Sequence, residues 1–167
     1  DEEAIQSLKR ETRICLQLNH KHIVRLFNLD KRNDLFLIVM EYVRGCTLSQ
    51  MMARHGTLPP LMAAQIVAVM TDALSYAHRH GVLHKDLTPG NVLISDDGVL
   101  KLIDFGIADM INRQCSNEEF VIGTPAYMSP EQLRGEPLDA RTDVYSLGVL
   151  TYQIMTGMLP SRPDATV

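Results

Sequence analysis

Two features that would indicate a nucleic-acid-binding or a membrane protein are missing from this sequence of 167 residues. The net charge is −4, so there is no excess of basic residues to bind nucleic-acid phosphates. The longest unbroken apolar run, residues 35–40, is far shorter than the roughly 20 apolar residues that a membrane helix needs. We therefore expect no nucleic-acid partner and no membrane span in this chain.

The cysteines lack the paired spacing of a zinc site and the density of a disulfide scaffold. Cys15, Cys46 and Cys115 lie far apart in the sequence. We interpret them as reduced thiols and expect a cytoplasmic protein. Hydrophobic residues make up 46% of the chain and charged residues 22%, which is ordinary for a soluble globular domain with a core of its own.

The pattern of apolar residues predicts an α+β fold. Helical spacing is found in residues 5–18, 60–80 and 143–155, and short β-like runs in residues 23–29, 35–43, 92–94 and 99–103. Residues 30–34 form a charged turn between two of these runs, which indicates a hairpin. We expect the strand to break at residues 44–46 before a short helix that begins at residues 47–49. The segment 143–155 is apolar on most faces, which predicts a helix buried all round.

Two loop segments carry residues suited to phosphoryl transfer. In the first, Asp86 and Asn91 lie five residues apart, and in the second Asp104 follows the next predicted strand. Each residue alone is a common turn former. Together they supply a carboxylate base for a hydroxyl group and two oxygen ligands, Asn91 and Asp104, for Mg²⁺.

The order of motifs resembles that of the eukaryotic-type (Hanks-type) Ser/Thr protein kinases. The matching motifs are His84-Lys85-Asp86 with Asn91, Asp104-Phe105-Gly106, and Ser129-Pro130-Glu131. Residues 127–132 and 139–148 are most similar to bacterial members. The resemblance implies an ATP-dependent Ser/Thr protein kinase that uses Mg²⁺ to phosphorylate a protein substrate in signal transduction. It also implies that Thr124 contacts the catalytic Asp86.

The resemblance further implies which residues bind the nucleotide. Helical spacing alone leaves Glu11 either buried beside a cation or at a rim that reaches water; the family pattern favours a glutamate that pairs with the phosphate-binding lysine. Met40 is similar to the gatekeeper, and the backbone of Glu41 and Val43 to the hinge that bonds adenine. Leu93 would lie beneath the adenine ring.

The same resemblance implies a division of the chain. Residues 1–43 would form a partial N-lobe, with helix C, the later strands and the hinge. Residues 44–167 would form most of a helical C-lobe that stops before its last helices. The Gly-rich loop and the phosphate-binding lysine precede helix C in this family, so we expect this chain to be part of a larger signalling protein and to be inactive alone.

Two positions depart from the family pattern and keep an alternative open. Thr88 replaces the lysine that usually steadies the transferred phosphate, and Lys85 replaces an arginine. The alternative is a pseudokinase that binds nucleotide or partners without turnover. A small-molecule kinase of the aminoglycoside or choline type ranks lower, because such enzymes lack the segment from Gly123-Thr124 to Ser129-Pro130-Glu131.

Overall fold

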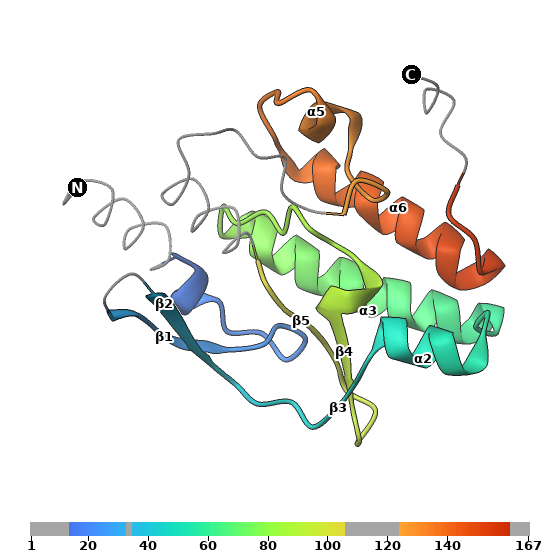
Figure 1. The fold of residues 1–167 in the computed structure, drawn as a ribbon, viewed down its shortest axis with the longest axis horizontal. Coiled ribbons are helices and arrows are strands. Elements are labelled where there is room, and N and C mark those ends of the chain that lie inside the picture. Colours follow the sequence, from blue (N-terminus) through green and yellow to red (C-terminus); the bar gives the residue numbers. More distant parts are fainter. Residues whose placement is uncertain (1–13, 33–34, 106–123, 161–167) are drawn as a thin grey trace.

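The structure is a computed structural model that describes residues 14–32, 35–105 and 124–160. Two small antiparallel sheets lie beside a group of helices, and the longest helices run side by side (Figure 1). The strands are β1 (Leu26–Arg32), β2 (Leu35–Met40), β3 (Gly45–Thr47), β4 (Val92–Ser95) and β5 (Leu100–Leu102). The helices are α2 (Leu48–His55), α3 (Pro60–Arg79), the 3₁₀ turn η1 (Pro89–Asn91), α5 (Pro130–Leu133) and α6 (Ala140–Thr156).

The predicted hairpin at the start of the chain is confirmed. Strands β1 and β2 pair antiparallel, and the pairing extends into the charged segment as far as Arg32 opposite Leu35. The chain before β1 is joined to the second sheet, because the Val24 backbone N–H donates to the Leu102 carbonyl at 2.9 Å. Of the helix predicted at residues 5–18, residues 14–18 are described, and the helix ends at residue 17. The first hairpin is thus anchored to β5.

The predicted strand ends earlier than the break expected at residues 44–46, because β2 stops at Met40, and a short strand not predicted from the sequence follows. Gly45 begins β3, which pairs antiparallel with β4, and β4 pairs in turn with β5. The approach of the two backbones at Gly45 is very close: a Cβ there would lie 2.0 Å from the Ile94 carbonyl oxygen. Glycine at this position therefore permits the strand that its sequence context seemed to exclude.

The start of α2 has a capping box, as the polar residues there favour. The Thr47 side chain accepts a hydrogen bond from the Gln50 backbone N–H at 3.1 Å. In return, the Gln50 side-chain oxygen accepts one from the Thr47 backbone N–H at 3.0 Å. Because Thr47 is also the last residue of β3, this cap fixes the angle at which the chain leaves the sheet and enters the helix.

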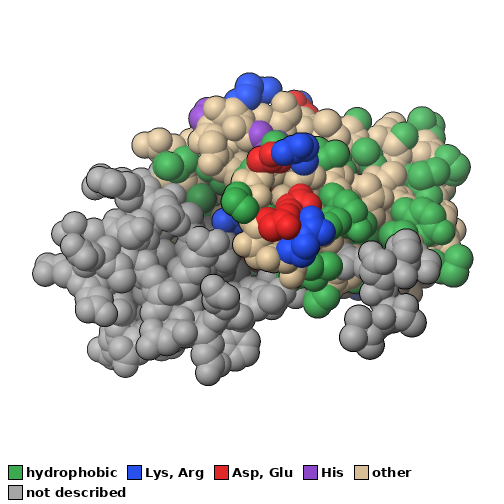
Figure 2. Space-filling model, turned by 90° about the horizontal axis from the view of Figure 1, so that it is seen from above, with side chains coloured by type: hydrophobic (Ala, Val, Ile, Leu, Met, Phe, Trp, Pro, Cys, Tyr) green, Lys and Arg blue, Asp and Glu red, His purple; other side chains and the backbone are tan. Residues whose placement is uncertain are grey.

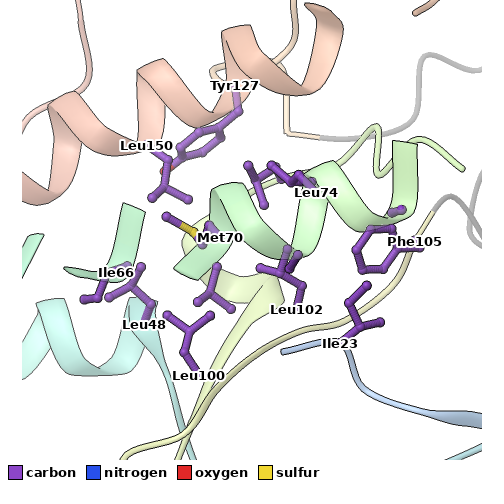
Figure 3. Packing of buried hydrophobic residues seen from close by; sticks show 14 of the residues in the cluster. Ile23, Leu48, Ile66, Met70, Leu74, Leu100, Leu102, Phe105, Tyr127 and Leu150 are labelled. Carbon is purple, nitrogen blue, oxygen red and sulfur yellow. The ribbon is translucent and has the colours of Figure 1, made fainter. Parts of the chain in front are cut away.

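Helix α3 is the central element of the core, packed between β5 and α6 (Figure 3). Its length and composition would suit a membrane helix, but core helices of soluble proteins share both properties. Here one face of it is buried against the rest of the domain. The buried side chains on that face are Ala63, Ile66, Met70, Ala73, Leu74 and Ala77. They meet Leu150 of α6 and Leu102 of β5 in one hydrophobic cluster.

Helix α6 is not buried all round, which corrects the prediction for residues 143–155. Its inner face is buried through Val149, Leu150 and Ile154, whereas Val144 is 60% exposed and Met155 is 50% exposed. Figure 2, viewed from the side of α5 and α6, shows hydrophobic side chains over much of this face. The described residues pack on only one side of α6. The helix therefore has more apolar side chains than this contact can bury.

The close approach at Gly45 gives a test of the β3–β4 pairing. Gly45→Ala should lower the free energy of unfolding by about 1–3 kcal/mol, because the added methyl group overlaps backbone atoms that cannot move independently. Urea unfolding of the full-length protein would measure this. Gly148→Ala is the matched control: a Cβ at Gly148 of α6 meets nothing within 4 Å. Alanine favours helix more than glycine does, so Gly148→Ala should not lower the free energy of unfolding. An equal decrease in the free energy of unfolding in both variants would contradict the β3–β4 geometry.

Candidate active site

Asp86 is held by groups from two parts of the chain. The Asn91 side-chain amide donates to the Asp86 carboxylate at 3.0 Å and to its carbonyl oxygen at 2.8 Å. The turn η1 brings Asn91 back to Asp86, with the Asn91 backbone N–H donating to the Thr88 carbonyl at 3.0 Å. From the far side, the Thr124 backbone N–H donates to the other Asp86 oxygen at 3.4 Å. The structure thus brings Asp86, Asn91 and Thr124 together.

The loop that carries Asp86 is fastened to α6 by a buried carboxylate. Asp143 is 0% exposed. One of its oxygens accepts from the His84 backbone N–H at 2.8 Å and contacts the His78 ring nitrogen at 2.7 Å, while the other accepts from the Lys85 backbone N–H at 2.8 Å. These bonds hold Lys85 at a positive φ of 67°, an uncommon conformation for a residue with a side chain.

The hydrogen bonds to Asp143 outweigh the effect of its burial on its pKa. Burial alone would raise the pKa of this carboxyl group, because it disfavours the charged form. The hydrogen bond from His78 and the backbone N–H groups of His84 and Lys85 favour the charged form, and the net pKa is below the ordinary value. Asp143 is therefore a charged anchor in the interior.

Asp104 lies in an environment that favours a cation. Burial raises its pKa and the nearby charge of Asp86 raises it further, while His84 opposes these effects. Its backbone has a positive φ of 63°, which turns the chain sharply after β5. Asn91 uses its NH₂ group on Asp86, which leaves its amide oxygen as a possible ligand. A carboxylate and an amide oxygen are donors of the kind that Mg²⁺ prefers, so Asp104 and Asn91 fit such an ion.

The His84 side chain lies in buried surroundings that disfavour its charged form. It is fully buried, and burial lowers the pKa of its imidazole. Among the described residues, neither of its ring nitrogens has a hydrogen-bond partner. The ring instead packs on Phe105 at 4.7 Å between centroids, and the Cys15 thiol approaches the Phe105 carbonyl at 3.7 Å. Leu26 lines a small cavity together with Cys15 and Phe105.

The residues predicted to bind the nucleotide come from β2, from the segment after it and from β4. Met40 ends β2, with Glu41 and Val43 directly after it, and Leu93 is in β4 opposite Thr47. The Glu41 side chain forms an ion pair with Lys101 at 2.8 Å and accepts from the Arg25 backbone N–H at 3.2 Å. Burial would raise the pKa of Glu41, but these bonds lower it overall. The expected hinge is thus tied to β5. Glu11 lies outside the described residues.

Three residues that support the site were not predicted from the sequence: His78, Lys101 and Gln132. His78 lies four residues after the buried Leu74, so its polar side chain on a core-facing stripe was an available signal. The Gln132 side chain donates to the Lys85 carbonyl at 2.7 Å, which joins α5 to the catalytic loop. Gln132 is marked locally as the last residue of the capping box that begins at Ser129, but its bond to Lys85 has no local signal, nor does the role of Lys101.

The role of Asp143 predicts a pH-dependent loss of stability. Asp143→Asn should lower the free energy of unfolding by about 1.5–3 kcal/mol at neutral pH, since hydrogen bonds to a charged acceptor are lost. The folded-state pKa of Asp143 lies below the ordinary 3.8. Its contribution is therefore fully present above the pKa of the unfolded state and is lost as the pH falls through the folded pKa.

Urea unfolding at pH 7 and at about pH 3 would measure this difference between the native protein and the variant. Asp72→Asn is the control, because Asp72 is an exposed partner of His20 at 3.4 Å and such pairs contribute little. A gap between Asp143→Asn and the native protein that stays constant down to pH 3 would contradict a charged anchor.

Comparison with known proteins agrees with this geometry. The chain is 37% identical over its whole length to the probable serine/threonine-protein kinase CPE1738 of Clostridium perfringens, of which it covers 24%. It is 41% identical over 95% of its length to PknB of Mycobacterium leprae, covering 26% of that protein. It is 34% identical over its whole length to PrkC of Bacillus subtilis, also covering 26%. The chain therefore spans about a quarter of the length of these curated relatives.

A solved structure is similar as well. The crystal structure of Rad53 1-466 in complex with AMP-PNP matches with a TM-score of 0.76 and 32% identity, covering 95% of this chain and 40% of that one. The sequence profile described as protein kinase domain matches residues 1–166. With Asp86, Asn91 and Asp104 gathered at one site, the chain belongs to the protein kinase domain family.

Proposed function

We propose that this chain is the catalytic part of an ATP-dependent Ser/Thr protein kinase that acts in signalling, within a larger protein. The observation that carries the proposal is the fixed orientation of Asp86, whose two carboxylate oxygens accept from Asn91 and from the Thr124 backbone. Its curated relatives are named serine/threonine-protein kinases, which supports the choice of substrate hydroxyl.

In the proposed reaction, the oxygen of the substrate hydroxyl group bonds to the γ-phosphorus of ATP, and Asp86 accepts the proton of that hydroxyl group. The bond between that phosphorus and the bridging oxygen of ADP breaks, and ADP leaves with that electron pair. Asn91 holds Asp86 in place and, with Asp104, would hold Mg²⁺. The metal, when bound, would neutralise phosphate charge and would offset the burial that raises the pKa of Asp104.

The nucleotide would lie against the hinge. We assign adenine contacts to the backbone of Glu41 and Val43, with Met40 beside the ring and Leu93 beneath it. The ion pair of Glu41 with Lys101 supports this assignment, because it fixes the hinge backbone relative to the second sheet. Glu11 would pair with the lysine that binds the phosphates. The structural match to a kinase crystallised with AMP-PNP is consistent with ATP as the phosphate donor.

A pseudokinase is the second candidate, and Thr88 is the observation that favours it. Thr88 is only 7% exposed, so it is a buried neutral residue where the family pattern has a cation. Loss of one donor to developing negative charge typically costs about 2.7–4 kcal/mol in a preorganised site. A pseudokinase would bind nucleotide with no turnover, which the next experiment distinguishes.

Asp86→Asn in the full-length protein should reduce phosphoryl transfer by about 10²–10⁴-fold while ATP affinity stays unchanged, because an amide cannot accept the proton. Transfer from radiolabelled ATP to a protein substrate would be measured. Asp96→Asn is the control: Asp96 lies in the turn after β4, and its ion-pair partner among the described residues is the exposed Arg44. Transfer at the native rate in Asp86→Asn would remove Asp86 as the base, and nucleotide binding without any native turnover would favour the pseudokinase.

Asp104→Ala should weaken nucleotide binding in the presence of Mg²⁺ and have less effect without it. The reason is that the Asp104 carboxylate is proposed to bind the metal and not the adenine ring of the nucleotide. Calorimetric titration with ATP in magnesium, and again in a chelator, would measure the two affinities. Equal losses in both conditions would show that Asp104 acts through folding instead. Unchanged affinity in magnesium would contradict the metal role altogether.

A further inference from the structure

The loop at residues 18–22 connects the first described helical turn to β1 and contacts α3. The Asn19 backbone N–H donates to the Tyr76 hydroxyl of α3 at 3.2 Å. The His20 ring stacks on the Tyr76 ring with 4.9 Å between centroids, and its Nε2 lies 3.4 Å from an Asp72 carboxylate oxygen. Asn19 and His20 thus join this loop to α3.

The two ring nitrogens of His20 have different roles. Nδ1 faces the His22 backbone N–H at 3.3 Å, and because an N–H group can only donate, Nδ1 accepts and carries no proton. The proton of the neutral ring is then on Nε2, where it faces the Asp72 carboxylate. Protonation would add a proton to Nδ1, so that two donors would face each other. The charged form of His20 therefore cannot keep the hydrogen bond from the His22 backbone.

The two neighbouring histidines are arranged differently. Nδ1 of His22 lies 2.8 Å from the Leu100 carbonyl oxygen, and Nδ1 of His80 lies 2.8 Å from the Tyr76 carbonyl oxygen. A carbonyl oxygen can only accept, so each of these Nδ1 atoms donates, and protonation at Nε2 leaves both bonds in place. Among these three histidines, His20 is the one whose described hydrogen bond from the backbone is lost on protonation.

The surroundings of His20 disfavour its charged form overall. The titratable or charged side chains that face it among the described residues are Lys21, His22, Asp72, Tyr76 and, beyond Tyr76, His80. Burial lowers the pKa of the imidazole, Asp72 raises it, and His22 and Lys21 lower it, so the net pKa is below the ordinary 6.5. The stability that neutral His20 contributes is fully present above the unfolded-state pKa and is lost as the pH falls through the folded pKa.

The same loop positions residues that pack beside the candidate active site. Cys15 and Leu18, which precede Asn19, are buried. The Cys15 thiol approaches the Phe105 carbonyl at 3.7 Å, and Phe105 follows Asp104 directly in the chain. A loop that separated from α3 would therefore loosen the packing beside Asp104.

We propose that His20 is a pH-sensitive regulatory contact, which holds the loop at residues 18–22 on α3 when neutral and releases it when protonated. Release loosens the residues beside Asp104 and lowers phosphoryl transfer at acidic pH. The effect on activity rests on the proposed kinase function, whereas the release of the loop does not.

Amide hydrogen exchange in the full-length protein tests the contact directly. The backbone N–H groups of Asn19 and His22 are measured at about pH 7.5 and about pH 5.5, with each rate corrected for the intrinsic effect of pH on exchange. Their protection should fall by roughly three- to tenfold at the lower pH, because one proton taken up a pH unit below 6.5 can favour opening by at most about tenfold. Equal protection at the two pH values would overturn the inference.

The variant His20→Asn separates His20 from other titrating groups. Its side-chain oxygen can accept from the His22 N–H in place of Nδ1 and does not titrate, so protection should become independent of pH. His80→Gln is the matched control, because His80 is exposed and keeps its bond to the Tyr76 carbonyl when protonated. The native pH dependence in His20→Asn, or its loss in His80→Gln, would overturn the inference.

A measurement on the native protein decides the matter if a thermal melt shows that His20→Asn does not fold. Nitrogen NMR of the histidine rings should find the His20 proton on Nε2 at about pH 7.5, with Nδ1 gaining a proton over the pH range in which protection is lost. A proton on Nδ1 at about pH 7.5, or a ring that stays neutral while protection falls, would contradict the proposed contact.

Phosphoryl transfer tests the effect on activity. The rate of the native protein divided by that of His20→Asn should be lower at about pH 5.5 than at about pH 7.5 by roughly threefold or more, since other effects of pH on the reaction act on both proteins alike. A ratio that does not change with pH would overturn the regulatory role of His20. Transfer by neither protein at any pH would overturn the proposed kinase function, and hydrogen exchange would still decide whether the loop is released.

Discussion

The buried carboxylate of Asp143 is the constraint on which the site depends. It joins three elements, since it accepts from the backbone of His84 and Lys85 in the catalytic loop and contacts His78 of α3 from its own position in α6. A charge in the interior is tolerated only when it is well hydrogen-bonded. That requirement works in both directions: the carboxylate needs the loop, and the loop keeps the unusual positive φ of Lys85 because the carboxylate holds it. Asp86 is the next residue after Lys85, so the same hydrogen bonds help to fix its position.

The sequence predicted the parts of the fold that depend on interactions between residues close together in the chain. Helix α3, the first hairpin and the strands β4 and β5 follow from apolar spacing and turn residues, and the grouping of Asp86, Asn91 and Asp104 follows from motif order. Strand β3 escaped prediction because its partner is nearly fifty residues away, and glycine normally ends a strand. Gly45 is there because a side chain would collide with Ile94, a contact that only the folded structure reveals.

The supporting residues show why the remainder of the site could not be predicted. Lys101 meets Glu41, Gln132 meets the Lys85 carbonyl, and His78 meets Asp143, each across a long separation in sequence. A side chain that stabilises another residue's backbone leaves no periodic pattern of its own. Helix α6 illustrates the opposite error, in which composition predicted more burial than the described contacts provide. Hydrophobic content states what a helix could bury, whereas its neighbours determine what it does bury.

Two carboxylates lie close together at the candidate site. Asp86 raises the pKa of Asp104, so their charges oppose each other and favour a cation nearby. Asp86 also accepts hydrogen bonds from Asn91 and from the Thr124 backbone, which stabilise its carboxylate in one orientation. The charged form of Asp104 is disfavoured by burial, so a bound cation would stabilise that carboxylate in particular.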